Sequence, residues 1–274
     1  PGYLAIDRLG NDMTAWVQCE GKVIPYRVGT YELSYSITNA QGQTVRAVRT
    51  VTVEPQQIAG TIEPEEKTIY LTFDDGPGPY TEQLLKVLDR NDVKATFFVT
   101  AAEPRYLPVI AKAYRAGHKI GVHSYGHDYD RIYASEEAFF EDFLKIQDII
   151  LQQTGSYTDI LRFPGGSSNT ISSASPDIMT LLTDEVRSLG YQYFDWNVLS
   201  GDAGETSHTS EVVRNVIEGI EGLPEGEAAI VLQHDNRRFS VDAVEKIIQW
   251  GKEIGYTFRS LDCTSPPAHF NLAN

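Results

Sequence analysis

The sequence has few cysteines, no long apolar run and no targeting segment at its start. Only two of the 274 residues are cysteine, Cys19 and Cys263, and they form no CxxC pair. A thiolate metal site is therefore not expected, and we expect two free, mostly buried thiols. No apolar run approaches the ~20 residues that a membrane span needs. The chain opens with Pro1 and lacks a basic-then-apolar start, so we expect a mature or trimmed product.

Basic residues are also scarce. The chain has 23 Lys and Arg against 38 Asp and Glu, a formal net charge of −15. Nucleic-acid binding requires clustered cations that neutralise phosphates, so this balance argues against it and predicts a soluble acidic surface. Hydrophobic residues make up 41% of the chain, enough for a substantial core. The length fits one large domain plus a small one.

Residues 1–54 carry a pattern typical of β structure. Apolar residues alternate with polar or small ones on both sides of a turn-rich stretch at 39–43. The alternating residues are Tyr31, Leu33, Tyr35 and Ile37 before the turn, and Val45, Ala47, Val51 and Val53 after it. Period-two alternation around a glycine-containing turn predicts a β-hairpin, and no helical pattern interrupts the region. We expect a small all-β sandwich over residues 1–54, followed by a polar linker over 55–67.

From residue 68 to 274 the pattern alternates between strand and helix. Apolar, β-branched or aromatic runs fall at 69–73, 94–99, 118–122, 159–163, 191–195, 228–233 and 256–259. Helical stretches fall between them, at 81–90, 107–116, 135–154, 177–189, 210–220 and 240–254. This order predicts parallel strands joined by crossover helices. Seven strands favour a barrel over an open sheet, although periodicity alone does not separate the two.

Ionisable residues stand where the predicted strands end. Asp74 and Asp75 follow the first run of this region, and His123 follows the third, with His127 four residues later. The later runs end at Arg162, Asp195 and His234. In a barrel of parallel strands these ends open on one face, where such folds place their active sites. The repeated coincidence predicts one site built from all these strand ends.

The residue types fit a metal-dependent hydrolase. One Asp and two His make a three-ligand metal site with an open position, so Asp75, His123 and His127 are the candidate ligands. Asp74 would lie beside the ion without binding it, where a carboxylate can act as a general base.

The remaining strand-end residues suit supporting roles. His234 is the candidate proton donor to the leaving group. Asp195 could hold the imidazole of His234 in its correct tautomer, and Arg162 could pair with Asp74 and orient it.

Five segments together resemble the motifs of the NodB-homology polysaccharide deacetylases, carbohydrate esterase family 4. They are Thr72-Phe-Asp-Asp-Gly-Pro77, His123-Ser-Tyr-Gly-His127, Arg162-Phe-Pro-Gly-Gly166, Asp195-Trp-Asn197 and Leu232-Gln-His-Asp235. The resemblance spans about residues 66–262. It implies a distorted (β/α)7 TIM-like barrel, Asp74 as base, and Asp75, His123 and His127 as ligands of a divalent ion, usually Zn²⁺, with Co²⁺, Mn²⁺ or Ni²⁺ as alternatives.

The same resemblance assigns further roles. It makes His234 the catalytic acid, Asp195 the residue that tunes it, and the backbone N–H of Gly165 an oxyanion donor. Many members have tyrosine at the position of Gly165 and proline at that of Phe163, so the substrate contacts made by this part of the site should differ from theirs. Trp196 has two readings, a platform for sugar or a core residue, and Leu232 either lines an acetyl pocket or packs in the core.

The front region is similar to bacterial immunoglobulin-like surface modules, on Gly29-Thr-Tyr, Tyr35-Ser-Ile-Thr-Asn and the closing Thr50-Val-Thr-Val. A surface module favours peptidoglycan as the substrate and an extracellular or cell-surface location in a bacterium. Chitin oligomers, an exopolysaccharide or acetylated xylan are alternatives. A non-catalytic glycan-binding surface protein is the competing class, but it should have lost a site residue. A serine hydrolase lacks support because no G-x-S-x-G occurs.

Overall fold

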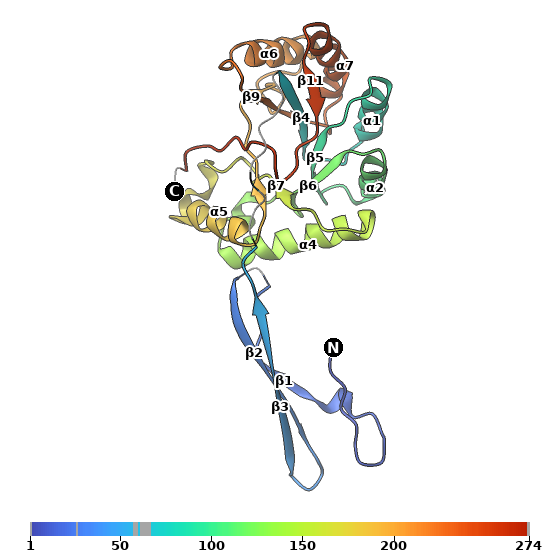
Figure 1. Ribbon diagram of the computed structural model, residues 1–274, viewed down its shortest axis with the longest axis vertical. Helices are drawn as coiled ribbons and strands as arrows, with labels where there is room; N and C mark the ends of the chain where they lie inside the picture. The colour runs from blue at the N-terminus through green and yellow to red at the C-terminus, as the bar shows by residue number, and fades with distance from the viewer. Residues whose placement is uncertain (1, 26, 57–59, 61–66, 273–274) are drawn as a thin grey trace. The chain divides into compact units, whose positions relative to one another are not determined.

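The computed structural model describes residues 2–25, 27–56, 60 and 67–272 (Figure 1). The chain divides into two compact units, residues 1–56 and 57–274. Most of the predicted linker, residues 55–67, lies outside the described residues. None of the described helices is long and apolar enough to cross a membrane.

The first unit is all β apart from one short 3-10 turn, η1 (Thr14–Trp16). Strands β1 (Gln18–Glu20), β2 (Gly29–Thr38) and β3 (Thr44–Val53) form an antiparallel sheet in the order β1-β2-β3. The predicted hairpin is confirmed, with ten cross-strand pairs from Gly29↔Val53 to Thr38↔Thr44. Opposed residues share a face, so the alternating apolar side chains of β2 and β3 lie together. Within the described residues, this unit has one sheet.

Both cysteines are free, but only Cys263 is partly buried. Cys19 is exposed, so the prediction of a mostly buried thiol is wrong for this residue. The physical reason is that β1 is a three-residue edge strand of the sheet, and all three of its positions are exposed to solvent.

The second unit is a curled parallel sheet surrounded by helices (Figure 1). Its strands are β4 (Thr68–Asp74), β5 (Thr96–Thr100), β6 (Lys119–Ser124), β7 (Ile160–Leu161), β8 (Gln192–Tyr193), β9 (Val198–Leu199), β10 (Ala229–His234) and β11 (Thr257–Arg259). Their order is β8-β7-β6-β5-β4-β10-β9, with β11 paired to the first half of β4. All seven predicted runs are strands, and β9 is an addition. The predicted barrel class is confirmed.

The helices occupy the predicted stretches within one or two residues. They are α1 (Thr81–Arg90), α2 (Pro108–Arg115), α4 (Glu136–Thr154), α5 (Ile178–Ser188), α6 (Thr209–Glu221) and α7 (Arg238–Glu253), with the short α3 (Tyr129–Ile132) and 3-10 turns η2 (Pro104–Tyr106) and η3 (Ile171–Ala174) in addition. Local chemistry sets the ends of α4. The Ser135 hydroxyl accepts the Ala138 N–H at its start, and Gly155 ends it with a φ of 82°.

Burial explains why the central strands are apolar throughout. Every residue of β4 and β5 is buried, because helices cover one side of the sheet and side chains fill the other. A core cluster that includes Phe98, Ile160, Phe194 and Ile230 joins four segments of the barrel. Because the strands are parallel, their carboxyl ends meet on one side of this core, and the candidate site lies there.

Candidate active site

The side chains of Asp75, His123 and His127 come together as predicted. The Nε2 atom of His127 lies 3.1 Å from Asp75 Oδ1, and that of His123 lies 3.5 Å from the same oxygen. One ligand atom from each residue falls within 4.8 Å of the others. The two His residues come from the end of β6 and the loop after it, and Asp75 follows β4 directly.

Neighbouring groups orient these three side chains. His123 is buried, and its Nδ1 donates a hydrogen bond to the backbone carbonyl of Arg162 at 2.8 Å. This bond leaves the lone pair of Nε2 for the site. Asp75 and His127 have left-handed backbones, with φ of 70° and 53°. The Thr100 hydroxyl holds the Asp75 carbonyl at 2.9 Å, and the Ser124 hydroxyl accepts the His127 N–H at 2.8 Å.

The cluster fits a divalent cation. The Oδ1 atom of Asp75 is buried and has no hydrogen-bond donor among the described residues. Burial acts to raise the pKa of Asp75, but the imidazoles of His123 and His127 close to its carboxylate outweigh it and hold that pKa well below its usual range. One ionised carboxylate and two imidazoles form a donor set that suits zinc and similar ions.

Asp74 lies beside the cluster and pairs with Arg162. Asp74 is 3% exposed, and Arg162 Nη1 donates to its Oδ1 at 2.9 Å. Its other oxygen, Oδ2, lies 3.9 Å from His123 Nε2, on the side of the candidate metal ligands. The fully buried guanidinium of Arg162 also donates to the Thr72 hydroxyl and to the carbonyls of Phe194 and Asp195. These bonds fix the guanidinium and, through it, one oxygen of Asp74.

His234 faces the cluster from the end of β10, with its Nε2 3.9 Å from Asp75 Oδ2. Its Nδ1 donates to Asp202 Oδ1 at 2.7 Å, and its backbone N–H donates to Asp202 Oδ2 at 2.8 Å. Burial acts to lower the pKa of His234, but the hydrogen bond and the charge of Asp202 outweigh it and raise this pKa to about 9.

The acidic partner of His234 is therefore Asp202, and the prediction that Asp195 holds this imidazole is wrong. Asp195 is fully buried, and its carboxylate accepts the backbone N–H groups of Ser167 and Phe270 at 2.7 and 2.8 Å. It thus ties the loop after β7 to the C-terminal segment. Asp202 sits in the glycine-rich loop between β9 and α6.

Three predicted contact residues line or support the same end of the barrel. Gly165 has a φ of 76°, and a Cβ there would meet the Tyr129 ring at 3.3 Å. Trp196 packs edge-on against Phe270, with ring centroids 5.0 Å apart, which favours its core reading. Leu232 is 6% exposed. Contacts of these residues with a sugar or an oxyanion stay predictions.

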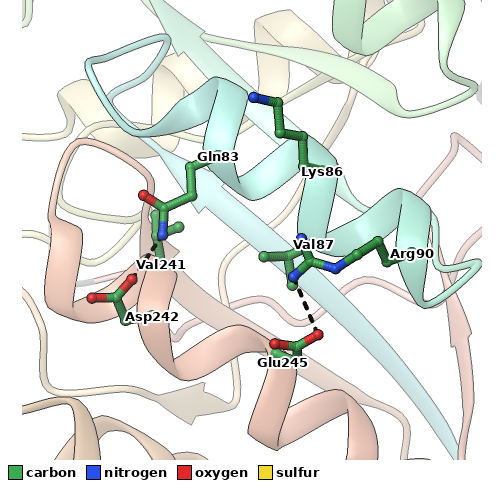
Figure 2. A pocket seen from close by; sticks show the side chains of 7 residues that line it. All are labelled: Gln83, Lys86, Val87, Arg90, Val241, Asp242 and Glu245. Atoms are coloured by element: carbon green, nitrogen blue, oxygen red, sulfur yellow. Dashed lines mark hydrogen bonds and ion pairs between the residues drawn. The ribbon is translucent and has the colours of Figure 1, made fainter.

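Two pockets bear on the choice of site. One, of about 460 Å³, is lined by two of the candidate metal ligands, Asp75 and His127, and so adjoins the cluster. The other, of about 400 Å³, is a groove between α1 and α7 (Figure 2). There, Gln83 bonds to Asp242 at 2.8 Å and Arg90 pairs with Glu245 at 3.2 Å. This groove contains none of the predicted site residues, so we assign it no catalytic role.

Comparison with known proteins agrees with this geometry. Residues 61–193 match the family model described as polysaccharide deacetylase, and residues 1–53 match that of the bacterial surface protein Ig-like domain. A peptidoglycan-N-acetylglucosamine deacetylase of Bacillus cereus is 32% identical over 202 residues, covering 72% of this chain and 70% of the relative.

Solved structures extend the likeness past residue 193. The catalytic domain of a peptidoglycan N-acetylglucosamine deacetylase from Eubacterium rectale is 51% identical, with a TM-score of 0.77, over 79% of this chain and 98% of that one. A polysaccharide deacetylase from Bacillus cereus is 30% identical, with a TM-score of 0.63, over 75% of this chain and 96% of that one.

Proposed function

The chain belongs to the polysaccharide deacetylase family, and from this premise we propose that it removes N-acetyl groups from the N-acetylglucosamine of bacterial peptidoglycan. The reaction would use a divalent ion held by Asp75, His123 and His127, and Zn²⁺ is the first candidate for that ion. One observation carries the proposal. The three-residue cluster is flanked by the Asp74–Arg162 pair on one side and the His234–Asp202 pair on the other. Hydrolysis of an amide needs a group of each kind, one that accepts a proton and one that donates it.

The residues divide the reaction as follows. A bound divalent ion would supply Lewis-acid polarisation and acidify water at this position. Asp74 accepts the proton of the attacking water on Oδ2, because its Oδ1 is engaged by Arg162. The amine leaves with a proton from Nε2 of His234, which the raised pKa keeps protonated at neutral pH. The N–H of Gly165 would stabilise the developing oxyanion, an interaction worth ~3 kcal/mol for one donor.

Acetate release tests the proposal. The purified chain would be incubated with intact peptidoglycan, chitooligosaccharides and acetylated xylan, with and without a chelator. We expect the fastest release from peptidoglycan, loss of release with chelator, recovery on adding Zn²⁺, and loss in Asp74→Asn. Asp148→Asn is a matched control, because it changes an exposed carboxylate on α4. Full release in the presence of chelator, or in Asp74→Asn, would contradict the mechanism. Metal binding without release from any polymer would favour the glycan-binding alternative.

We also propose that the protein works at the bacterial surface. The immunoglobulin-like match at residues 1–53 supports this address, and so do the relatives that act on peptidoglycan. In this proposal residues 1–54 are a separate module, 55–67 a linker and 68–274 the catalytic barrel. Limited proteolysis tests the division. Cleavage confined to 55–67, releasing an active fragment, would support it, and cleavage within the barrel at the same rate would not.

A further inference from the structure

Within the part of the chain that the structure describes, the pocket beside the metal cluster is lined by one cation that forms no ion pair. It is bounded by the loop after β4, the end of β5 with the turn beyond it, His127, and the turn between β10 and α7. Three residues with full charges line it, namely Asp75, Glu103 and Arg237. Asp75 is a candidate metal ligand, and Glu103 pairs with Arg105 at 3.4 Å.

Arg237 has no such partner in the described ranges 2–25, 27–56, 60 and 67–272. Among the described residues no carboxylate lies within ion-pairing distance of its guanidinium, and its Nε is buried without a hydrogen bond. The neighbouring Arg238 differs, because it pairs with Asp242 one helical turn along α7 at 3.5 Å. Beside Arg237 in the same lining, the Asn236 Oδ1 is also buried, and no described residue donates a hydrogen bond to it. Groups buried without partners are costly, and a ligand can supply the missing hydrogen bonds.

Packing holds this turn firmly against the loop that follows β4. A Cβ on Gly78 would lie 3.1 Å from the Cβ of Asn236, and one on Gly76 would overlap the Asp235 carboxylate. Asp235 in turn accepts a hydrogen bond from the Thr81 hydroxyl at 2.6 Å. The backbone that carries Arg237 is therefore fixed relative to Asp75, which lies in the same loop as Gly76.

We propose that this pocket is a subsite for a carboxylate on the sugar unit next to the one that loses its acetyl group, with Arg237 as the cation that binds it. The inference rests on the proposed function. A guanidinium binds a carboxylate through parallel hydrogen bonds, which gives specificity as well as affinity. In peptidoglycan the neighbour of N-acetylglucosamine is a muramic acid unit. It offers a carboxylate either on its lactyl group, where the peptide is absent, or on the peptide stem. Chitin offers none.

The test compares kcat/KM for acetate release on three substrates that differ in carboxylates. They are intact glycan strands with peptide stems, strands with the stems removed by an amidase, and neutral chitooligosaccharides. For Arg237→Gln we expect a loss on the order of ten- to a hundredfold, mainly in KM, on the carboxylate-bearing strands, and a change below about twofold on chitooligosaccharides. The strand type with the larger loss identifies which carboxylate is bound.

Two further measurements keep the test decisive. Arg238→Gln is the control, since it removes a neighbouring arginine that is already paired, and it should leave all three substrates unchanged. Arg237→Lys should recover part of the loss, because it keeps the charge but not the planar fork. In the unmodified protein, 0.5 M salt should raise KM for the charged strands more than for chitooligosaccharides.

Equal losses on all three substrates, or no loss on the charged strands, would overturn the inference while leaving the deacetylase proposal intact. Absence of acetate release from every substrate in the unmodified protein would instead contradict the proposed function. The two failures are therefore distinguishable.

Discussion

Replacing Asp202 by asparagine changes the charge beside His234 and little else. The side chain keeps its size, and its remaining oxygen can still accept the His234 backbone N–H, which Oδ2 now accepts at 2.8 Å. The amide nitrogen then replaces the oxygen that accepts the Nδ1 proton at 2.7 Å. Because Asp202 is 1% exposed, no water can readily replace the lost acceptor.

The size of the effect follows from this hydrogen bond. A buried hydrogen bond between charged partners contributes about 1.5–3 kcal/mol. If the protonated imidazole loses that amount, the pKa of His234 falls by about one to two units, since ~1.4 kcal/mol corresponds to one unit. At pH 9 the protonated fraction that can donate to the leaving amine, and with it the rate, should then fall about 7- to 80-fold. The pKa of His234, now raised to about 9, should fall toward its ordinary value in the same variant.

The assay is kcat for acetate release at pH 9, with the pKa of His234 followed by NMR of its ring. Asp195→Asn is the comparison, because it alters an equally buried carboxylate at the position that the sequence favoured as the partner. We expect the low kcat and the lower His234 pKa in Asp202→Asn only. An unchanged kcat in Asp202→Asn, or a lower His234 pKa in Asp195→Asn, would refute the assignment of Asp202.

Three other predictions follow from groups elsewhere in the barrel. His118 is neutral and accepts the Ala95 N–H, and burial, aided by the charge of a nearby lysine, lowers its pKa to about 4. The pKa of His118 in the unfolded chain is ~6.5, so the unfolding free energy should fall by ~3 kcal/mol in total as the pH drops from 6.5 to 4. Urea denaturation at several pH values should show this dependence of the unfolding free energy on pH, and His118→Asn should weaken it. His123→Ala removes one of three candidate ligands and should weaken zinc binding in equilibrium dialysis at least ~10-fold, and full retention of zinc would exclude His123 as a ligand. Asp195→Ala leaves the Ser167 N–H without its acceptor and should cost ~1–3 kcal/mol of stability, measured as a lower Tm.

The metal cluster was predictable because strand geometry alone brings it together. Asp75 and His123 each follow a buried strand, and parallel strands end on one side of the sheet. The sequence motifs added the distinction between Asp74 and Asp75, whose roles stay predictions, and Arg162 bonds to Asp74. The same expectation, that residues at the carboxyl ends of parallel strands meet on one side of the sheet, correctly placed His234 near the cluster.

The partner of His234 was missed because this expectation fails where the strand is short. Strand β8 has only two residues and ends at Tyr193, so the carboxylate of Asp195 is past the regular ladder and accepts from Ser167 instead. Asp202 lies in a loop, where no periodic pattern indicates which way a side chain points. Its one visible signal was a carboxylate in a glycine-rich segment after a strand.

Two of the three candidate metal ligands have the left-handed backbone conformation that glycine adopts at the lowest steric cost. Asp75 and His127 have φ of 70° and 53°, and a left-handed backbone costs a residue with a side chain of order 1 kcal/mol. Hydrogen bonds to the backbone from the hydroxyls of Thr100 and Ser124 stabilise Asp75 and His127 in these conformations. If Asp75 and His127 hold an ion as proposed, its binding energy would offset the cost of these two backbone conformations.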